Sequence, residues 1–165
     1  MADELTPRMK QAVDLVVYLN KDDARKKTNI PYLAHLFQVC SLVMQDGGDE
    51  DEGIAGLLHD ALEDKAHLIT RKQIEARFGE RVARMVVAAT DTDPDVESSA
   101  EKEEWSARKA RYIRHLHEHG VPAEMRVSLA DKVYNLGAIL RDHAHIGDEV
   151  WGRFNARINA IYWYY

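Results

Sequence analysis

The sequence predicts an all-α fold, a compact single-domain bundle of about eight helices. Apolar residues recur at three- and four-residue spacings through most of the chain, which is the period of a helix with one buried face. No segment shows the alternation of apolar and polar residues that is typical of a half-buried strand. Residues that commonly begin or end helices bracket the apolar segments, among them Thr6 with Pro7, Thr70, Gly79 and Gly120.

These signals place the helices in chain order. We expect them over residues 9–19, about 31–44, a segment that ends at residue 64, 71–78, 80–90, 105–120, 122–143 and 147–165. The acidic stretch over residues 91–104 carries Pro and Ser and lacks apolar periodicity, which indicates a solvated loop or a mobile flap beside a site. The aromatic segment IYWYY should dock on the body of the protein or on another subunit, and we interpret it as docking within the chain.

Length and composition are those of one globular domain, residues 1–165. Hydrophobic residues make up 45% of the chain and charged residues 30%, and the formal net charge of −6 argues against nucleic acid as a partner. The single cysteine, Cys40, lies in an apolar run and has no intrachain partner, which favours a reducing cytoplasm. The sequence shows no signal peptide and no apolar run of membrane-spanning length, so we expect a soluble cytoplasmic protein.

The segment GLLHDALED, residues 56–64, places a histidine and three carboxylates at the end of an apolar helix. Burying that much charge is unfavourable unless a cation compensates it. On a continuous helix His59 and Glu63 lie four residues apart, as do Asp60 and Asp64, so each pair shares a stripe. His59 and Asp60 diverge by about 100° and can share a target only if it lies close between them. A metal ion at the helix surface meets this condition.

Two further helices supply compatible ligands in apolar surroundings. His35 lies in PYLAHLFQV, and Asp131 lies one turn before Asn135 in VSLADKVYNLGAIL. Each has an ordinary structural interpretation when taken singly, as a hydrogen-bonded core histidine or as an aspartate paired with a lysine. Together with His59 and Asp60 they form a mixed nitrogen and oxygen set that suits Mn²⁺, Fe²⁺ or Zn²⁺. We therefore predict a divalent metal site formed by these four side chains.

The order of these ligands resembles the HD superfamily of metal-dependent phosphohydrolases. More closely, PYLAH, LLHDALED, ITRKQIEARFGERVARMVVAATD and SLADKVYNL are similar to the hydrolase domain of RelA/SpoT-type enzymes and to the stand-alone small alarmone hydrolases. The similarity covers roughly residues 8–145, most of the chain. It implies a helical domain of the HD type with its core over these residues, and we expect residues 147–165 to form a C-terminal helix that packs on that core.

The resemblance also implies an activity. It implies Mn²⁺-dependent removal of the 3′-diphosphate from guanosine tetra- or pentaphosphate, with the metal on the four side chains named above. Glu63 and Asp64 would position and activate the attacking water, and Glu63 is our first choice for the base. Two carboxylates this close are expected to titrate as a coupled pair, so the division of roles between them stays open. Asn135 matches the asparagine that contacts the ribose region of the nucleotide.

An anionic substrate requires cationic contacts, and two segments offer them. Arg25 and Lys26 precede the PY motif, as a basic pair does in the family. The segment RKARY offers Arg108, Lys109 and Tyr112. Arginine suits bidentate contact with phosphate, and lysine acts as a point charge. A solvated helix face is an equally good interpretation of each segment, and both interpretations stay open.

Two other functions are compatible with the same residues. One is an HD phosphohydrolase that acts on another nucleotide or phosphoester, and the other is a non-catalytic HD protein that senses nucleotides. The intact Glu–Asp pair counts against the second, because a pure binder does not need a group that activates water. We expect a small-molecule nucleotide as partner, neither nucleic acid nor membrane, and leave the oligomeric state open. The histidines of HLHEHG, residues 115–120, together with His143 and His145, are interpreted as surface groups near helix ends.

Overall fold

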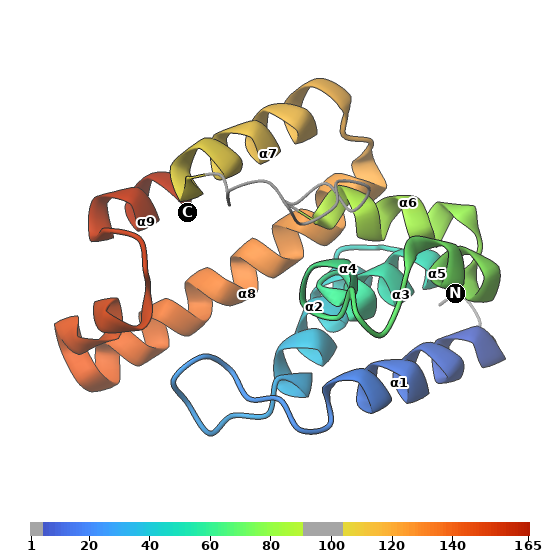
Figure 1. Cartoon of the computed structure of the whole chain (residues 1–165), viewed down its shortest axis with the longest axis horizontal. Helices are drawn as coiled ribbons and strands as arrows, with labels where there is room; N and C mark the ends of the chain where they lie inside the picture. The colour runs from blue at the N-terminus through green and yellow to red at the C-terminus, as the bar shows by residue number, and fades with distance from the viewer. Residues whose placement is uncertain (1–4, 91–103) are drawn as a thin grey trace.

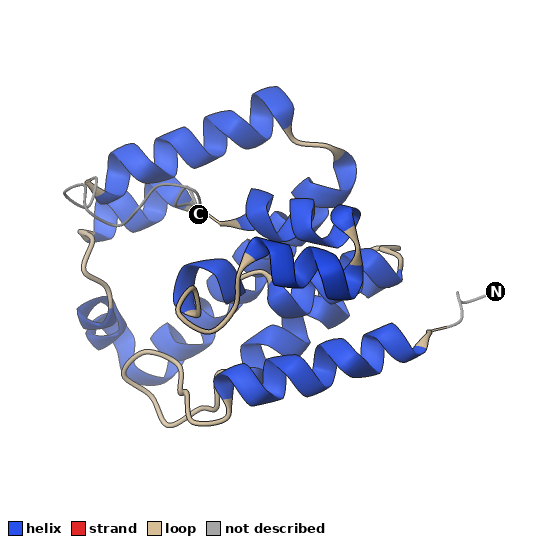
Figure 2. Cartoon of the chain, turned by 45° about the vertical axis from the view of Figure 1, so that its right-hand side comes forward, coloured by secondary structure: helices blue, strands red, loops and turns tan. Residues whose placement is uncertain are grey.

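A computed structural model of the chain describes residues 5–90 and 104–165. Within these ranges the chain forms α-helices and one 3₁₀ helix, and no strand (Figure 2). The elements are α1 (Pro7–Asn20), α2 (Leu33–Gln45), α3 (Glu50–Leu58), α4 (Ala61–Asp64), α5 (Arg71–Phe78), α6 (Glu80–Ala89), α7 (Trp105–His119), α8 (Pro122–Ile146), η1 (Gly147–Arg153) and α9 (Ile158–Tyr164). The all-α prediction is confirmed. The predicted loop over 91–104 lies, except for its last residue, outside the described residues.

Local signals in the sequence fix several helix ends. The Thr6 hydroxyl accepts a backbone N–H of the first turn of α1, and Pro7 occupies the first helical position. Thr70 and Gln73 form a reciprocal capping box at the start of α5. Gly79 separates α5 from α6 with a φ of 90°, a conformation that residues with a β-carbon rarely adopt. These are the starts and stops that the sequence predicts.

The predicted continuous helix through HDALED is wrong. α3 ends just before His59, a turn follows, and α4 begins just after Asp60. At Asp60 the backbone ψ is −2°, and its carbonyl accepts the N–H groups of both Glu63 and Asp64, so the hydrogen-bond ladder restarts there. His59 and Asp60 therefore lie in a turn, and Glu63 and Asp64 lie on the short helix that follows it. The shared stripes expected on one straight helix are absent from this segment.

The predicted C-terminal helix over 147–165 is also wrong in detail. α8 continues beyond the predicted end at residue 143, and Gly147 ends it with a φ of 59°, which a glycine adopts without strain. The 3₁₀ helix η1 follows, and the backbone is extended at Phe154 and again at Arg157 before α9 begins. Two short elements thus replace one helix, and they fold back along α8 (Figure 1).

The main core lies between α1, α2, α3, α5, α6 and the first half of α8. α2 and α3 approach most closely at Gly56, where a β-carbon would lie 3.2 Å from the Cα of Cys40. His35 on α2 and His59 at the end of α3 lie within about one and a half turns of this crossing. Close packing of the two backbones therefore brings the two imidazoles together.

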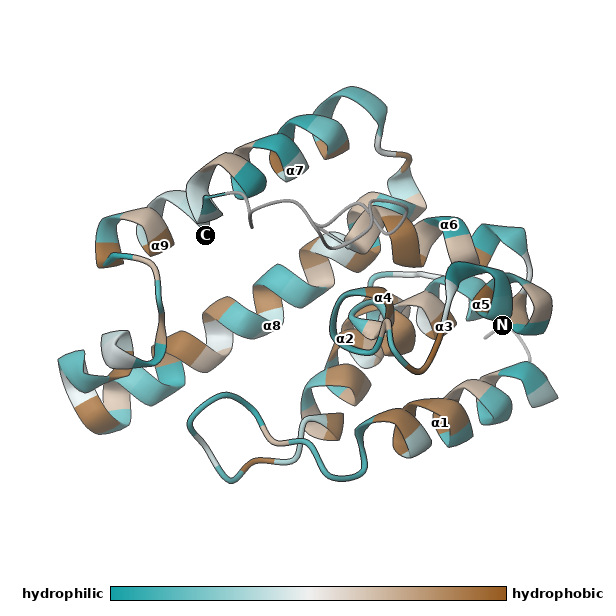
Figure 3. Ribbon diagram, viewed as in Figure 1, coloured by the Kyte–Doolittle hydropathy of each residue, from teal (hydrophilic) through white to brown (hydrophobic). Residues whose placement is uncertain are grey.

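α7 and α9 lie on the opposite side of α8 from the main core (Figures 1 and 2). The described backbones of these two helices lie farther from the other elements than those of the core helices do, whereas the backbone of η1 lies close to that of α8. α7 is mostly hydrophilic (Figure 3). None of the described helices combines the length and the apolar composition needed to cross a membrane. α8 is consequently the element that joins the dense core to a thinner outer layer.

Candidate metal centre and pocket

Four side chains from three parts of the chain converge on one point. The Nε2 atoms of His35 and His59 lie 3.2 Å apart. The Asp60 Oδ2 atom lies 3.5 Å from the first of these nitrogens and 3.0 Å from the second. The Asp131 Oδ1 atom lies 3.4 Å and 3.7 Å from the same two nitrogens. The structure thus brings together all four residues that the sequence predicts as metal ligands.

The spacing of these atoms fits a single divalent ion. Bonds of about 2.1 Å place neighbouring ligand atoms roughly 3.0 Å apart in octahedral and roughly 3.4 Å apart in tetrahedral coordination. The measured separations run from 3.0 to 3.7 Å. Over residues 5–90 and 104–165, one group of three or more ligating side chains has all its ligand atoms within 4.8 Å of one another, and its members are His35, His59 and Asp131. Asp60 is not a member of that group, and its Oδ2 atom approaches the site through the two histidine nitrogens, at 3.5 Å and 3.0 Å.

Neighbouring groups fix the orientation of the ligands. The Nδ1–H of His59 donates to the Gly56 carbonyl at 2.9 Å, which leaves the Nε2 lone pair directed at the centre. The Tyr32 hydroxyl donates to Asp60 Oδ2. The Asn135 amide donates to Asp131 Oδ1 at 2.6 Å. In metal sites, groups that do not bind the ion themselves typically hydrogen-bond to the ligands in this way and hold them in place.

The carboxylates of the cluster favour positive charge beside them. Burial opposes an imidazolium at His59, but the carboxylates of Asp60 and Asp131 outweigh burial and hold the pKa of His59 well above its ordinary value. Burial likewise opposes ionisation of Asp60, and His59 outweighs it and holds the pKa of that carboxyl well below its usual range. Burial lowers the pKa of His35. The two carboxylates thus attract positive charge to a largely buried site, and a divalent ion bound by these residues would take the place of the proton on His59.

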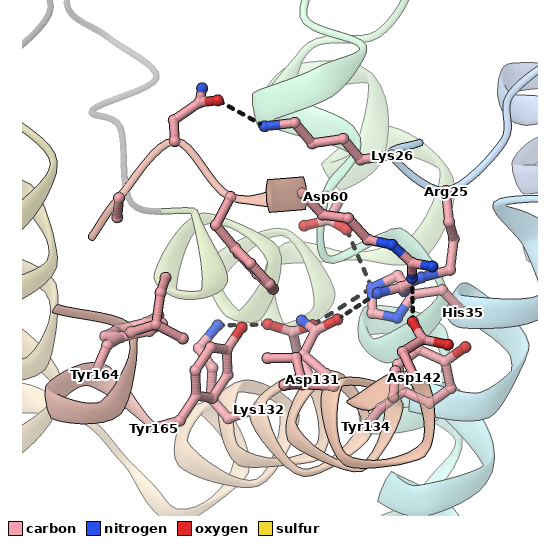
Figure 4. A pocket seen from close by; sticks show the side chains of 18 of the residues that line it. Arg25, Lys26, His35, Asp60, Asp131, Lys132, Tyr134, Asp142, Tyr164 and Tyr165 are labelled. Atoms are coloured by element: carbon pink, nitrogen blue, oxygen red, sulfur yellow. Dashed lines mark hydrogen bonds and ion pairs between the residues drawn. The ribbon is translucent and has the colours of Figure 1, made fainter. Parts of the chain in front are cut away.

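A pocket of about 510 Å³ opens directly beside the cluster. His35, Asp60 and Asp131 form part of its lining, and most of the rest comes from the loop over residues 25–32, from α4, α7, α8, η1 and α9, and from the segment between η1 and α9 (Figure 4). Six basic side chains also line it, namely Arg25, Lys26, Lys109, Lys132, Arg141 and Arg153. The arrangement suits a small polyanion that carries an aromatic or sugar group, because cations and tyrosine rings face the same space.

The predicted catalytic carboxylates line this pocket. Glu63 and Asp64 both lie on α4, within one turn of Asp60, and both are solvent-exposed. The protein that surrounds the Asp64 carboxyl, followed by the negative charge of Asp60, raises the pKa of Asp64. The turn at residues 59–60 therefore directs two ligands inward and leaves two carboxylates at the pocket wall, where water and substrate have access.

Five of the six predicted substrate-binding residues line the pocket, namely Arg25, Lys26, Lys109, Tyr112 and Asn135. The guanidinium of Arg25 donates to the Asn135 side-chain oxygen at 2.9 Å, and Asn135 in turn holds Asp131. Arg108 is the exception. It is 9% exposed and lies outside the pocket lining, although it shares a face of α7 with Trp105 and Tyr112, which do line the pocket. Its spacing on the helix therefore did not decide its placement.

Several pocket residues carry roles that the sequence did not reveal. The Lys132 ammonium donates to Asp131 Oδ2 and lies 5.4 Å and 5.6 Å from the ring centres of Tyr112 and Tyr164. Tyr32 contacts Asp60, as described above, and Tyr165 lines the pocket from the end of the described chain. Tyr32 lies within PYLAH and Lys132 lies within LADK. The sequence therefore shows that both are close to predicted ligands along the chain, but their contacts depend on tertiary packing.

The remaining histidines lie on the surface. His115 and His119 are exposed, and their ring centres lie 5.6 Å apart at the end of α7. His145 donates to the Arg141 carbonyl at 2.6 Å near the end of α8, and His143 contacts Asp148. The described residues therefore place these groups where the sequence interpretation puts them, away from the metal ligands.

Comparisons with known proteins agree with this geometry. The model of the family described as "HD domain" matches residues 12–162. The chain is 46% identical over 66 residues, 40% of its length, to a probable guanosine-3′,5′-bis(diphosphate) 3′-pyrophosphohydrolase of Synechocystis, but the match spans only 8% of that longer protein. It is 32% identical over 136 residues to the Xenopus tropicalis guanosine-3′,5′-bis(diphosphate) 3′-pyrophosphohydrolase MESH1, covering 79% of this chain and 69% of that protein.

A solved structure shares the fold over nearly the whole chain. It is that of a metazoan ortholog of SpoT that hydrolyzes ppGpp. The TM-score is 0.70 at 22% sequence identity, and the match covers 96% of this chain and 92% of the other. The arrangement of helices around the cluster is therefore one that a known protein also has.

Proposed function

This chain belongs to the HD domain family, and we propose that it hydrolyses guanosine tetra- and pentaphosphate and releases the 3′-diphosphate. One observation carries the proposal: a His–His–Asp–Asp cluster with the spacing of a metal site opens onto a pocket that also holds two exposed carboxylates and six cations. The relatives named for this activity support the choice of substrate.

We propose that His35, His59, Asp60 and Asp131 hold a divalent ion, and that the ion is Mn²⁺. A mixed set of imidazole and carboxylate donors supports a transition ion over Ca²⁺ or Mg²⁺, which prefer oxygen ligands alone. Such an ion supplies positive charge that makes water a stronger acid and polarises a phosphoryl oxygen.

The pocket carboxylates handle the attacking water. Glu63 orients the water and accepts its proton as the oxygen forms a bond to phosphorus, and Asp64 orients or shares this role. The bond from the ribose 3′-oxygen to phosphorus breaks, the 3′-oxygen leaves and takes up a proton, and pyrophosphate is released. The raised pKa of Asp64 favours its carrying a proton more readily than an ordinary aspartate does, which suits a group that shares protons with Glu63.

The basic side chains bind the substrate. Arg25 and Lys26 lie on the loop before α2, and Lys109 lies across the pocket on α7, so their charges face the same space from two sides. Asn135 is held between Arg25 and Asp131 and contacts the ribose region in this proposal. Tyr112 and Tyr164 form aromatic walls, each with the Lys132 ammonium over its ring.

Three broader proposals follow from this assignment. Residues 1–165 act as one unit, with residues 147–165 packed on the core over 8–145, which the buried side chains of Val150 and Ile161 support. The site is confined to small nucleotides, which the net charge of −6 supports because it disfavours nucleic acid. A soluble nucleotide as substrate supports a place in the cytoplasm.

The test is a substrate panel with purified protein. The protein is incubated with Mn²⁺, Mg²⁺ or Zn²⁺ and with guanosine tetraphosphate, guanosine pentaphosphate, nucleoside monophosphates or a dinucleotide phosphate, and released pyrophosphate and orthophosphate are measured separately. We expect pyrophosphate from the first two substrates, greatest with Mn²⁺. Glu63→Gln is the matched control, because it should bind metal and nucleotide without turnover. Orthophosphate released only from the other substrates would contradict the proposal.

A further inference from the structure

The exposed face of α8 is apolar along most of its length. Between residues 125 and 140 every solvent-exposed residue of this helix is apolar, namely Met125, Leu129, Val133, Leu136 and Leu140. Their exposed fractions range from 37% to 63%. At 100° per residue they span an arc of only about 80°, so they form one continuous stripe. An isolated amphipathic helix places polar residues on such a face.

The stripe continues onto a neighbouring element. Leu136 and Leu140 line a second, smaller pocket together with Tyr162 of α9, which is 65% exposed. Side chains of this size and exposure present on the order of 500 Å² of apolar surface, which reaches the range where a patch marks an interaction site. Figure 3 shows the hydrophobic colour recurring along α8. We call these six residues, the five of α8 and Tyr162, the α8 stripe.

We propose that the α8 stripe is an interface between two copies of this chain, with α8 of each packed antiparallel on the other. The spacing supports pairing with itself. Met125 and Leu140 lie eight and seven residues from Val133, and Leu129 and Leu136 lie four and three, so the stripe is nearly symmetric about Val133. A two-fold axis near that residue superposes the stripe on its copy, and the three- and four-residue intervals are those that interlock between packed helices.

The charges beside the stripe favour a second copy over other occupants. The flanking Arg126 is already paired with Asp46 and Glu52, and Lys132 with Asp131. Two copies can therefore approach without bringing uncompensated like charges together, and these two cations are already engaged and do not add attraction to an anionic lipid surface. The area is somewhat below the roughly 800 Å² that each partner contributes to a standard interface. A dimer that dissociates at micromolar concentration is the expected form.

Gly137 supports a close approach of the helices. It lies one turn from both Val133 and Leu140, and a β-carbon there would meet only the end of the Arg141 side chain, at 3.3 Å. The packing of the single chain thus does not require a glycine at this position, although glycine inside a helix costs about 1 kcal/mol. A second helix crossing here would use the missing side chain.

The experiment measures molar mass by sedimentation equilibrium between 1 and 200 µM, without substrate, so its outcome is independent of the proposed activity. We expect the mass to rise from 18.8 kDa toward twice that value. Leu129→Lys with Leu136→Lys should weaken association at least 100-fold and retain the helical circular dichroism signal. Leu68→Lys is the matched control, since Leu68 is 47% exposed and lies outside the stripe, and it should associate as the parent does.

A second variant locates the axis. Val133→Cys should form a disulfide-linked dimer on mild oxidation, because the residue meets itself across a two-fold axis near this position. A monomer throughout the concentration range, or association that the double lysine variant leaves unchanged, would overturn the proposal. So would binding of the monomer to anionic vesicles that the same variant abolishes, which would assign the stripe to a lipid surface.

Discussion

The two sides of α8 differ in how firmly they are held. On one side, α1 to α6 enclose a continuous apolar core that contains side chains with no solvent exposure, such as Val39, Ile54 and Val82. On the other side, the described backbones of α7 and α9 lie farther from α8, and aromatic rings and charged groups line the pocket between these helices. Three of the four proposed metal ligands come from α2 and the α3–α4 junction on the dense side, whereas Lys109, Tyr112 and Tyr164 come from the thin side.

This difference separates two tasks. A metal site requires ligand atoms fixed to within a fraction of an ångström, and a dense core provides that precision. A pocket for a nucleotide must admit and release it, and a layer with few contacts opens at a low cost in free energy. We therefore expect changes on the dense side to affect metal binding, catalysis and folding, and changes on the thin side to affect substrate affinity.

The largest effect is expected from loss of a ligand. His59→Ala or Asp131→Ala removes one of four ligands and leaves the charge of the cluster unbalanced, so the ion should be lost and turnover should fall at least about 1000-fold. Elemental analysis and a turnover assay measure the two effects. His143→Ala is the control, because that residue lies near the end of α8 outside the pocket lining and should retain both properties. Full metal occupancy in both ligand variants would refute the assignment.

Removing the proposed base should separate chemistry from binding. Glu63→Gln keeps the shape of the side chain but cannot accept a proton, and we expect kcat to fall about 100- to 1000-fold with metal content and nucleotide affinity retained. Asp64→Asn made in parallel shows how the role is divided. Single-turnover kinetics and calorimetric titration provide the measurements. A Glu63→Gln enzyme with normal kcat would exclude this residue as the base.

The contrast in packing can be tested by folding stability. Ile54 is fully buried in the dense side, and Ile158 at the start of α9 is 38% exposed. Ile54→Ala should lower the free energy of unfolding by about 2–5 kcal/mol, because it leaves a cavity in a packed core. The same change at Ile158 should cost less than about 1 kcal/mol. Urea denaturation measures both, and equal losses would show that the two sides are equally well packed.

A smaller effect is expected on the substrate side. The Lys109 ammonium lies 5.0 Å from the centre of the Tyr164 ring at the pocket wall. Lys109→Ala should raise KM about 5- to 20-fold and change kcat little, since its proposed role is to bind substrate and it lies on a different helix from the proposed base and every proposed metal ligand. Arg114→Ala on the exposed face of α7 should leave KM unchanged. A loss confined to kcat would place Lys109 in the chemical step.

The last prediction concerns the packing around Cys40 and involves no change in activity. Burial raises the pKa of its thiol to about 11, compared with an ordinary value near 9. A raised thiol pKa lowers the fraction of thiolate at pH 8, so alkylation by iodoacetamide should be about 100-fold slower in the folded protein than in urea. Mass spectrometry follows the reaction. Fast alkylation of the native protein would show that α2 opens at this point.

The sequence predicted those features that depend on local chemistry. Thr70 and Gly79 set the ends of α5 through the hydrogen bonds and φ angles of their own segment, so these helix ends can be predicted from the sequence. His35 and Asp131 stood out because polar groups in apolar helices need partners. Mn²⁺ and the catalytic roles of Glu63 and Asp64 came with the family resemblance and stay predictions.

What the sequence could not predict depends on three-dimensional placement. The helix is interrupted by the turn at residues 59–60. The sequence did not reveal this break, because the apolar periodicity of GLLHDALED continues through the turn. Arg108 and Lys109 are neighbours in sequence and both lie within about 60° of Tyr112 around α7, yet only Lys109 lines the pocket with Tyr112, so tertiary packing decides the difference. The role of Lys132 as a pocket cation depends on Tyr164, which is distant in sequence and lies beside it only in the folded chain.

The position of the four ligands along the chain gives the ion a mechanical role as well. It would join segments that lie far apart in sequence, because 24 positions separate His35 from His59 and 71 separate Asp60 from Asp131. In polymer terms the ion is a cross-link, and closing a loop of either size removes unfolded-chain entropy worth about 3–4.5 kcal/mol. Such a clamp does for this fold what a disulfide does elsewhere, in a chain whose one cysteine has no partner of its own.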